Sequence, residues 1–151
     1  MNLEHLNILL ADDDGDDYLF FKEVLEDLQV SANLTVVNNG DQLMQTLTNK
    51  DSKLPHLLFL DLNMPRKNGL ECLLEIKRDK KLNQIPVIIF STSFQKNMVD
   101  LLYKSGAQYY IRKPADFSGL KTIIQQVFFI ALQKNISQPE KENFVLPGSF
   151  K

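Results

Sequence analysis

Short apolar runs recur along the chain, and each of them ends abruptly at polar residues. They lie at residues 8–11, 34–37, 57–60, 87–90 and 108–112. Apolar runs of this length are typical of strands that are buried on both faces of a parallel sheet. The pattern therefore predicts a parallel sheet of five strands.

Helical spacing fills the segments between these runs. Phe21, Val24, Leu25 and Leu28 recur at intervals of three and four residues and predict a helix over residues 15–29. The same spacing marks further helices around residues 43–47, 72–76, 98–102 and 120–131. The regular alternation of strand and helix predicts an α/β fold: a single doubly wound five-stranded parallel sheet of flavodoxin-like (βα)5 type, with strand order 2-1-3-4-5.

The C-terminal segment departs from this alternation. The helical pattern stops near residue 134, and residues 134–151 are mostly polar, with a small apolar island at residues 144–147. A segment of this length is far too short to form a second folded domain. We therefore expect one domain over residues 1–133, a short tail over residues 134–151 and no attached output domain.

Composition narrows the class of protein. The formal net charge of −2 offers no broad cationic surface for nucleic acid. No segment approaches the roughly 20 apolar residues of a membrane span, and the first residues lack a secretory signal pattern. The single cysteine, Cys72, cannot form an internal disulfide, which fits a reducing cytosol. We expect a cytoplasmic protein that binds neither nucleic acid nor membrane.

Polar residues whose side chains can bind ligands or react stand directly after the predicted strands. Asp12 and Asp13 follow the first strand, Asp61 the third, Ser91 the fourth and Lys113 the fifth. The carboxyl ends of parallel strands meet at one edge of a sheet, where α/β proteins bind ligands. A few carboxylates suit a hard cation such as Mg²⁺, which keeps several waters, and Lys113 and Ser91 can bind anionic oxygens. The combination points to phosphoryl chemistry.

These residues and their neighbours resemble the receiver domain of two-component response regulators. The resemblance spans residues 6–133 and rests on four motifs in order: Asp12-Asp13, then Asp61-Leu62-Asn63-Met64-Pro65 with Gly69, then Ser91, then Lys113-Pro114. Within that family, residues 64–69 and 110–117 are similar to single-domain, chemotaxis-regulator-like proteins paired with phytochrome-type kinases. The resemblance implies a response regulator that accepts a phosphoryl group from a sensor histidine kinase or a histidine phosphotransfer protein.

The resemblance also implies how the acids act. Asp61 would be the phosphoacceptor. Asp13 and Asp61 would bind Mg²⁺ directly, together with the main-chain carbonyl of Asn63, and Asp12 would act largely through water. The protein would assist its own phosphorylation and dephosphorylation but would not be an enzyme with a separate substrate.

Three further residues receive roles from the resemblance. Lys113 and Ser91 would hold phosphoryl oxygens, and Tyr110 occupies the position of a switch aromatic. The bond between Lys113 and Pro114 is expected to be cis, which a following proline permits. Phosphorylation would then shift the domain between two states that both exist beforehand, and so change its protein contacts.

Simpler interpretations apply to some of these polar residues. Asp14, Asp16 and Asp17 fall in the first turn of a predicted helix, where the helix dipole alone favours acids. Ser93 is interpreted as the cap of the following helix. We therefore assign neither Asp17 nor Ser93 to the site.

Residues 128–130, Phe-Phe-Ile, are too many consecutive apolar residues for one helical face. We expect one of them to form part of an interface, although a tail that folds back could also cover it. We expect a homodimer or a kinase contact through the fourth helix, fifth strand and fifth helix, strengthened by phosphorylation. A two-fold dimer is the simplest form that self-association through this face could take.

Three alternatives remain at this stage. A degenerate receiver could act as a phosphorylation-independent scaffold, although the complete residue set argues against it. Phosphatases of the haloacid dehalogenase kind need an acid two residues after the nucleophile, where this chain has Asn63. A flavin- or nucleotide-binding module needs a Gly-rich or hydroxyl-rich first loop, whereas the acidic residues 12–17 would repel phosphate.

Overall fold

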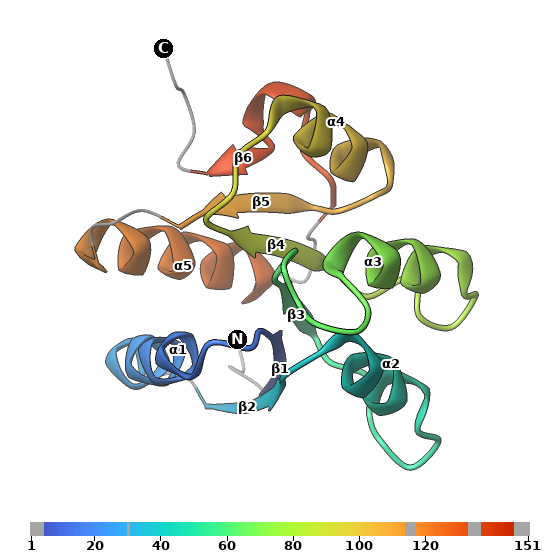
Figure 1. Ribbon diagram of the computed structural model, residues 1–151. Coiled ribbons are helices and arrows are strands. Elements are labelled where there is room, and N and C mark those ends of the chain that lie inside the picture. Colours follow the sequence, from blue (N-terminus) through green and yellow to red (C-terminus); the bar gives the residue numbers. More distant parts are fainter. Residues whose placement is uncertain (1–4, 30, 114–116, 133–136, 147–151) are drawn as a thin grey trace.

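In the part of the chain that the structure describes, six parallel strands form one sheet with helices on both faces (Figure 1). The computed structural model describes residues 5–29, 31–113, 117–132 and 137–146. The strand order is β2-β1-β3-β4-β5-β6. The strands are β1 Leu6–Ala11, β2 Ala32–Val37, β3 Leu57–Leu60, β4 Val87–Ser91, β5 Tyr109–Arg112 and β6 Val145–Leu146.

Within the described residues, five α-helices follow the first five strands in turn, and a short 3-10 helix precedes the last strand. They are α1 Gly15–Leu28, α2 Gly40–Thr48, α3 Gly69–Arg78, α4 Lys96–Lys104 and α5 Phe117–Leu132, with the 3-10 helix η1 at Lys141–Asn143. The predicted flavodoxin-like α/β fold and the order 2-1-3-4-5 of its five strands are confirmed. The predicted number of strands was wrong by one, because β6 extends the sheet beyond β5.

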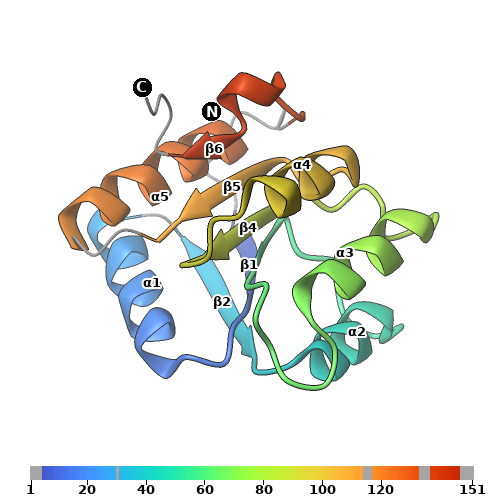
Figure 2. The ribbon, with the colours of Figure 1, turned by 45° about the horizontal axis from the view of Figure 1, so that its top comes forward.

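The two faces of the sheet bury different side chains. Figures 1 and 2 show α1 and α5 on one face and α2, α3 and α4 on the other. The α1/α5 face holds an aromatic cluster that includes Phe21, Phe59 and Phe90. The opposite face is mainly aliphatic and includes Leu60 and Ile89. Alternate residues of each buried strand supply the two cores, which is why these strands are apolar without a break.

The loop after β3 is folded tightly against the strand end. Gly69 donates its main-chain N–H to the carbonyl oxygen of Leu62 at 3.0 Å. A Cβ at Gly69 would lie 2.4 Å from the carbonyl oxygen of Asp61, so a side chain cannot be accommodated there. Asn68 and Glu71 then start α3 with a reciprocal capping box. These local rules fix the backbone around Asp61.

The tail segment, residues 137–146, packs beside β5 and α4 (Figure 2). Phe144 is fully buried, and its ring lies 5.1 Å from that of Tyr103 and 6.4 Å from that of Tyr110, between centroids. The Tyr110 main-chain N–H donates to the Phe144 carbonyl at 3.0 Å, and the Tyr103 hydroxyl donates to the Pro139 carbonyl at 2.8 Å. Phe144 is thus part of the core on the α4 face, and Val145 packs against that core.

Within the described ranges, no helix is both long and apolar enough to cross a bilayer.

Candidate functional site at the carboxyl edge of the sheet

Three acids converge where β1 and β3 end. Asp12, Asp13 and Asp61 can each offer one oxygen such that the three oxygens lie within 4.8 Å of one another. The pairing of β1 with β3, with Ala11 opposite Leu60, produces this convergence. Asp12 and Asp61 are buried and Asp13 is exposed. The structure therefore brings together the three acids that the sequence placed at this edge.

Main-chain hydrogen bonds orient the two buried acids. Asp12 accepts a bond from the Asp14 N–H at 2.9 Å. Asp61 accepts one from the Asn63 N–H at 3.3 Å, while its own N–H donates to the Ala11 carbonyl at 2.9 Å. Backbone groups at the strand ends therefore help to orient both carboxylates.

Burial makes the ionised acids costly. Burial, followed by a hydrogen bond with Asp17, raises the pKa of Asp12 to about 8. Burial also raises the pKa of Asp61, although the positive charge of Lys113 works in the opposite direction. Clustered buried carboxylates favour protons or cations, because either one relieves desolvation and repulsion.

The donor set fits a hard divalent cation. The three side chains supply only oxygens, and within the described part of the chain neither a thiol nor an imidazole belongs to the cluster. Oxygen ligands with room for water are what Mg²⁺ and Mn²⁺ prefer. The site can therefore bind a divalent metal.

Lys113 lies beside the acids but is held mainly by α1. Its Nζ is 2.6 Å from Asp17 Oδ2 and 3.1 Å from Asp12 Oδ2. The ammonium also lies 4.5 Å from the centroid of the Phe90 ring. Burial by itself lowers the pKa of Lys113, but the bond to Asp17 and the nearby acids outweigh it and leave this pKa raised. Lys113 is therefore a fixed positive charge.

Asp17 is the site residue that sequence reasoning missed. It was attributed to the helix dipole, yet its carboxylate pairs with an amine 96 residues later in the chain. The first-turn acids themselves carry no signal for this pairing, because the pairing depends on how α1 is placed against the end of β5.

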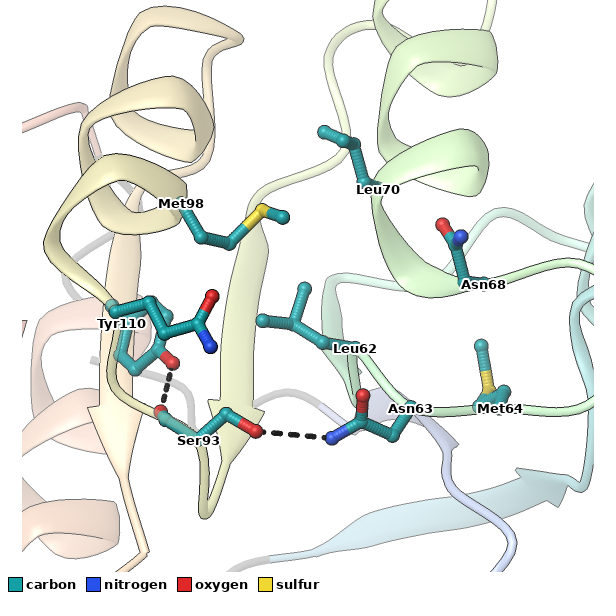
Figure 3. A pocket seen from close by; sticks show the side chains of 9 residues that line it. Leu62, Asn63, Met64, Asn68, Leu70, Ser93, Met98 and Tyr110 are labelled. Atoms are coloured by element: carbon teal, nitrogen blue, oxygen red, sulfur yellow. Dashed lines mark hydrogen bonds between the residues drawn. The ribbon is translucent and has the colours of Figure 1, made fainter.

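Ser91 and Tyr110 face the α4 side of the site. Both are fully buried. Ser91 Oγ accepts a bond from the Ser93 N–H at 3.1 Å, and the Tyr110 hydroxyl donates to the Ser93 carbonyl. Asn63 Nδ2 donates to Ser93 Oγ at 3.2 Å (Figure 3). The loop after β4 is thus tied both to the loop after β3 and to Tyr110.

The interpretation of Ser93 as a helix cap was wrong. Helix α4 begins at Lys96, its N-cap is Gln95, and no side chain caps it by a hydrogen bond. Instead, Ser93 Oγ accepts a hydrogen bond from Asn63, and the Ser93 carbonyl accepts one from Tyr110. The predicted cis bond before Pro114 lies outside the described residues.

A cavity of about 470 Å³ opens beside this loop (Figure 3). The side chains that line it come from the loop after β3, the start of α3, the loop before α4, α4 and β5. They are Leu62, Asn63, Met64, Asn68, Leu70, Ser93, Gln95, Met98 and Tyr110. Room for side-chain movement therefore exists directly beside Tyr110.

Fold and site together define a receiver domain of two-component signalling. The sequence model of the family described as "Response regulator receiver domain" matches residues 8–125, so the chain belongs to this family. Response regulator Rcp1 from Synechocystis sp. (strain ATCC 27184 / PCC 6803 / Kazusa) is 32% identical over 124 residues, which cover 80% of this chain and 84% of Rcp1.

Solved structures agree with this assignment. The phosphorylated cyanobacterial phytochrome response regulator RcpA superimposes with a TM-score of 0.82 at 31% identity, covering 90% of this chain and all of that chain. The Mn²⁺-bound form of Rcp1 superimposes with a TM-score of 0.80 at 30% identity, covering 89% of this chain and 99% of that chain.

The chain is therefore a receiver domain homologous to the phytochrome response regulators Rcp1 and RcpA, consistent with a phosphoacceptor role in two-component signalling. Receiver domains in general accept phosphoryl groups from histidine kinases or phosphotransfer proteins and are not enzymes with separate substrates. The acidic cluster supports divalent-metal binding, as in receivers generally.

Proposed function

We propose that this protein is a response regulator whose Asp61 carboxylate accepts a phosphoryl group from a sensor histidine kinase or a histidine phosphotransfer protein. The supporting observation is the convergence of Asp12, Asp13 and Asp61 within 4.8 Å at one edge of the sheet, with Lys113 beside them. Asp61 is the acid that combines burial with a place at the end of the central strand β3.

Asp61 is the nucleophile in the transfer. One of its carboxylate oxygens forms a bond to phosphorus as the bond from phosphorus to the donor's imidazole nitrogen breaks, and the electron pair leaves with the imidazole. The product on this chain is an acyl phosphate. The Asn63 and Ala11 main-chain contacts hold the attacking carboxylate in place, so geometry rather than acid–base chemistry is the main contribution of the chain.

Asp13, Asp61 and the main-chain carbonyl of Asn63 are the proposed ligands of Mg²⁺, with Asp12 acting through water. When bound, Mg²⁺ neutralises charge on the transferring phosphoryl group and on the acids around it. Lys113 supplies a second positive charge, and the hydroxyl of Ser91 donates to a phosphoryl oxygen.

Tyr110 is the proposed switch residue. Its ring is buried, its hydroxyl is bonded to the Ser93 carbonyl, and it borders the cavity of about 470 Å³. Ser91 Oγ accepts a hydrogen bond from the Ser93 N–H, so a movement of Ser91 toward a phosphoryl group would shift Ser93. That shift would also move the Ser93 carbonyl, to which the Tyr110 hydroxyl donates. This chain of contacts links phosphorylation to α4.

Partner contacts are proposed on the face formed by α4, β5 and α5. Among the apolar residues at 128–130, Phe128 is buried, whereas Phe129 is 64% exposed. The tail segment already covers the edge of β5, so a homodimer through this face would use Phe129 and α4 rather than β5 itself. Sedimentation of the protein and of Phe129→Ser, with and without phosphorylation, tests this dimer contact: a monomer in every state excludes the dimer.

We place the protein in the cytoplasm, in keeping with its single buried thiol.

Acetyl phosphate with Mg²⁺, read by intact mass, tests the central proposal. We expect one phosphoryl increment on the unmodified protein and on Asp51→Asn, a surface control, and none on Asp61→Asn. Failure of the unmodified protein to gain mass would favour the scaffold alternative. Full modification of Asp61→Asn would remove Asp61 as the acceptor.

A further inference from the structure

Within the described part of the chain, the contact with Asp17 is the shortest ion pair of Lys113, and the roles proposed above do not use it. Asp17 Oδ2 lies 2.6 Å from Lys113 Nζ, compared with 3.1 Å for Asp12 Oδ2. The side chains of Lys113 and Asp17 are only 13% and 17% exposed. A charge-assisted hydrogen bond that is largely shielded from water is stronger than an ordinary surface ion pair.

The contact places the ammonium on the α1 side of the site. Phe90 contacts the ammonium through its ring, with Nζ 4.5 Å from the ring centroid. Asp61 is not among the partners of Lys113 within 4.0 Å in the described part of the chain. Lys113 is therefore committed to two carboxylates that are not the proposed acceptor.

Asp17 and a phosphoryl group compete for the same amine. A phosphoryl group on Asp61 gains fully from Lys113 only if the ammonium turns from α1 toward β3, because Nζ lies 2.6 Å from Asp17 but more than 4.0 Å from the carboxylate oxygens of Asp61. Breaking the ion pair between Lys113 and Asp17 costs free energy. This cost lowers the stability of the phosphorylated state.

We propose that Asp17 is a positioning residue that holds Lys113 on the α1 side of the resting site. It thereby weakens the binding of a phosphoryl group at Asp61 by the protein. The inference rests on the proposed function, since it assumes that Lys113 binds phosphoryl oxygens. In this arrangement α1 sets the balance between the resting and phosphorylated states through one carboxylate.

The helix-dipole interpretation makes a different prediction, and Asp16 separates the two. Asp16 stands in the same first turn and carries the same charge, but it is exposed, and within the described part of the chain it forms no ion pair. Asp16→Asn is therefore a matched control for the charge and the dipole, without contact with Lys113.

The first test observes the resting protein with no phosphoryl donor present. The ammonium group of Lys113, assigned by its loss in Lys113→Ala, should give a slowly exchanging ¹H–¹⁵N signal in the unmodified protein and in Asp16→Asn. Asp17→Asn should lose this protection. A Lys113 signal that is unchanged in Asp17→Asn would overturn the proposal.

The second test measures the affinity for beryllofluoride, a phosphoryl mimic, in the presence of Mg²⁺. Asp17→Asn should bind it about fivefold more tightly than the unmodified protein, as expected from release of one ion pair, and Asp16→Asn should bind it unchanged. Equal gains in Asp16→Asn and Asp17→Asn would show a general charge effect and refute the positioning role.

A double-mutant cycle isolates the route through Lys113. In a Lys113→Ala background, Asp17→Asn should no longer tighten beryllofluoride binding. Persistence of the full gain would mean that Asp17 simply repels the anion, and the proposal would be wrong. If the unmodified protein itself binds no beryllofluoride, the proposed function fails, whereas the resting ammonium signal still reports on the Asp17 contact.

Discussion

The two faces of the sheet differ in how tightly they are packed near the site. On the α1/α5 face, aromatic rings interlock edge to face: Phe21 lies 4.7 Å from Phe59 and 5.1 Å from Phe90, between centroids. On the α4 face, Tyr110 borders a cavity of about 470 Å³ that the flexible side chain of Met98 also lines. One face is closed, and the other has space in which side chains can move.

The difference assigns different tasks to the two faces. Lys113 rests on the closed face, over Phe90, where its position is defined by packing and by Asp17. Tyr110 projects to the open face, where a change of rotamer does not require the core to expand. A switch needs both properties, because packed cores resist continuous deformation and movement must be confined to a region with room.

The largest expected effect is loss of packing on the closed face. Phe59 contacts the rings of Phe21, Phe90 and Phe128, and it is fully buried. Phe59→Ala should lower the free energy of unfolding by about 3–5 kcal/mol, because it removes a large side chain from a site that cannot collapse. Chemical denaturation measures this.

Met98→Ala is the matched change on the open face. Met98 is only partly buried and already borders empty space, so its truncation should cost no more than about 1 kcal/mol. Similar costs for Met98→Ala and Phe59→Ala would contradict the proposed contrast between the faces.

The tail should contribute an intermediate amount. Phe144 is fully buried between Tyr103 and Tyr110, so Phe144→Ala should destabilise the protein by about 3 kcal/mol, the low end of the range for a buried phenylalanine. It should also speed hydrogen exchange of the Tyr110 amide, which donates to the Phe144 carbonyl. Tyr103→Phe, which removes only the hydroxyl bond to Pro139, should cost about 1 kcal/mol. Unchanged exchange at Tyr110 in Phe144→Ala would show that β6 holds without its anchor.

The acids at the carboxyl edge of the sheet should make the stability of the protein depend on pH and on divalent metal. Because burial raises the pKa of Asp12 from 3.8 to about 8, the folded state binds more protons than the unfolded state between these values. The metal-free protein should therefore lose stability as pH rises from about 4 to 8. Mg²⁺ should restore about 1 kcal/mol at pH 8 and should restore much less in Asp13→Asn.

Thermal denaturation with EDTA or with Mg²⁺ measures this effect. Metal-free stability that rises steadily with pH across this range would contradict the raised pKa of Asp12. Equal stabilisation of Asp13→Asn by Mg²⁺ would exclude Asp13 as a ligand.

The smallest effect concerns a thiol on the α4 side of the sheet. Cys72 is fully buried, and burial raises the pKa of its thiol to about 11, so the thiol stays neutral well above pH 8. Alkylation by iodoacetamide at pH 8 should be negligible in the native protein and rapid after unfolding. Fast native labelling, followed by mass spectrometry, would show that looseness on this face extends beyond the cavity near Tyr110.

The parallel sheet and the position of the acids could be predicted because both follow local rules. Apolar runs such as residues 57–60 have one stable environment, the interior of a parallel sheet, and their carboxyl ends must then lie at one edge. The predicted strand order alone therefore indicates that Asp12 and Asp61 lie close together.

Long-range pairings could not be predicted in the same way. Strand β6 contains only two residues, too few to show a period, and it forms because Phe144 finds a pocket between Tyr103 and Tyr110. The Asp17–Lys113 pair depends on how α1 is rotated against β5. Nothing in the first-turn acids themselves records that orientation.

Backbone hydrogen exchange of the protein, before and after Asp61 is phosphorylated with acetyl phosphate and Mg²⁺, tests the central claim most directly. We expect changes in the loop after β4, in α4 and in the tail segment, with the buried parts of α1 and α5 unaffected, and no change anywhere in Asp61→Asn given the same treatment. Equal changes on both faces of the sheet, or the same changes in Asp61→Asn, would contradict a switch that is driven from Asp61 and confined to the open face.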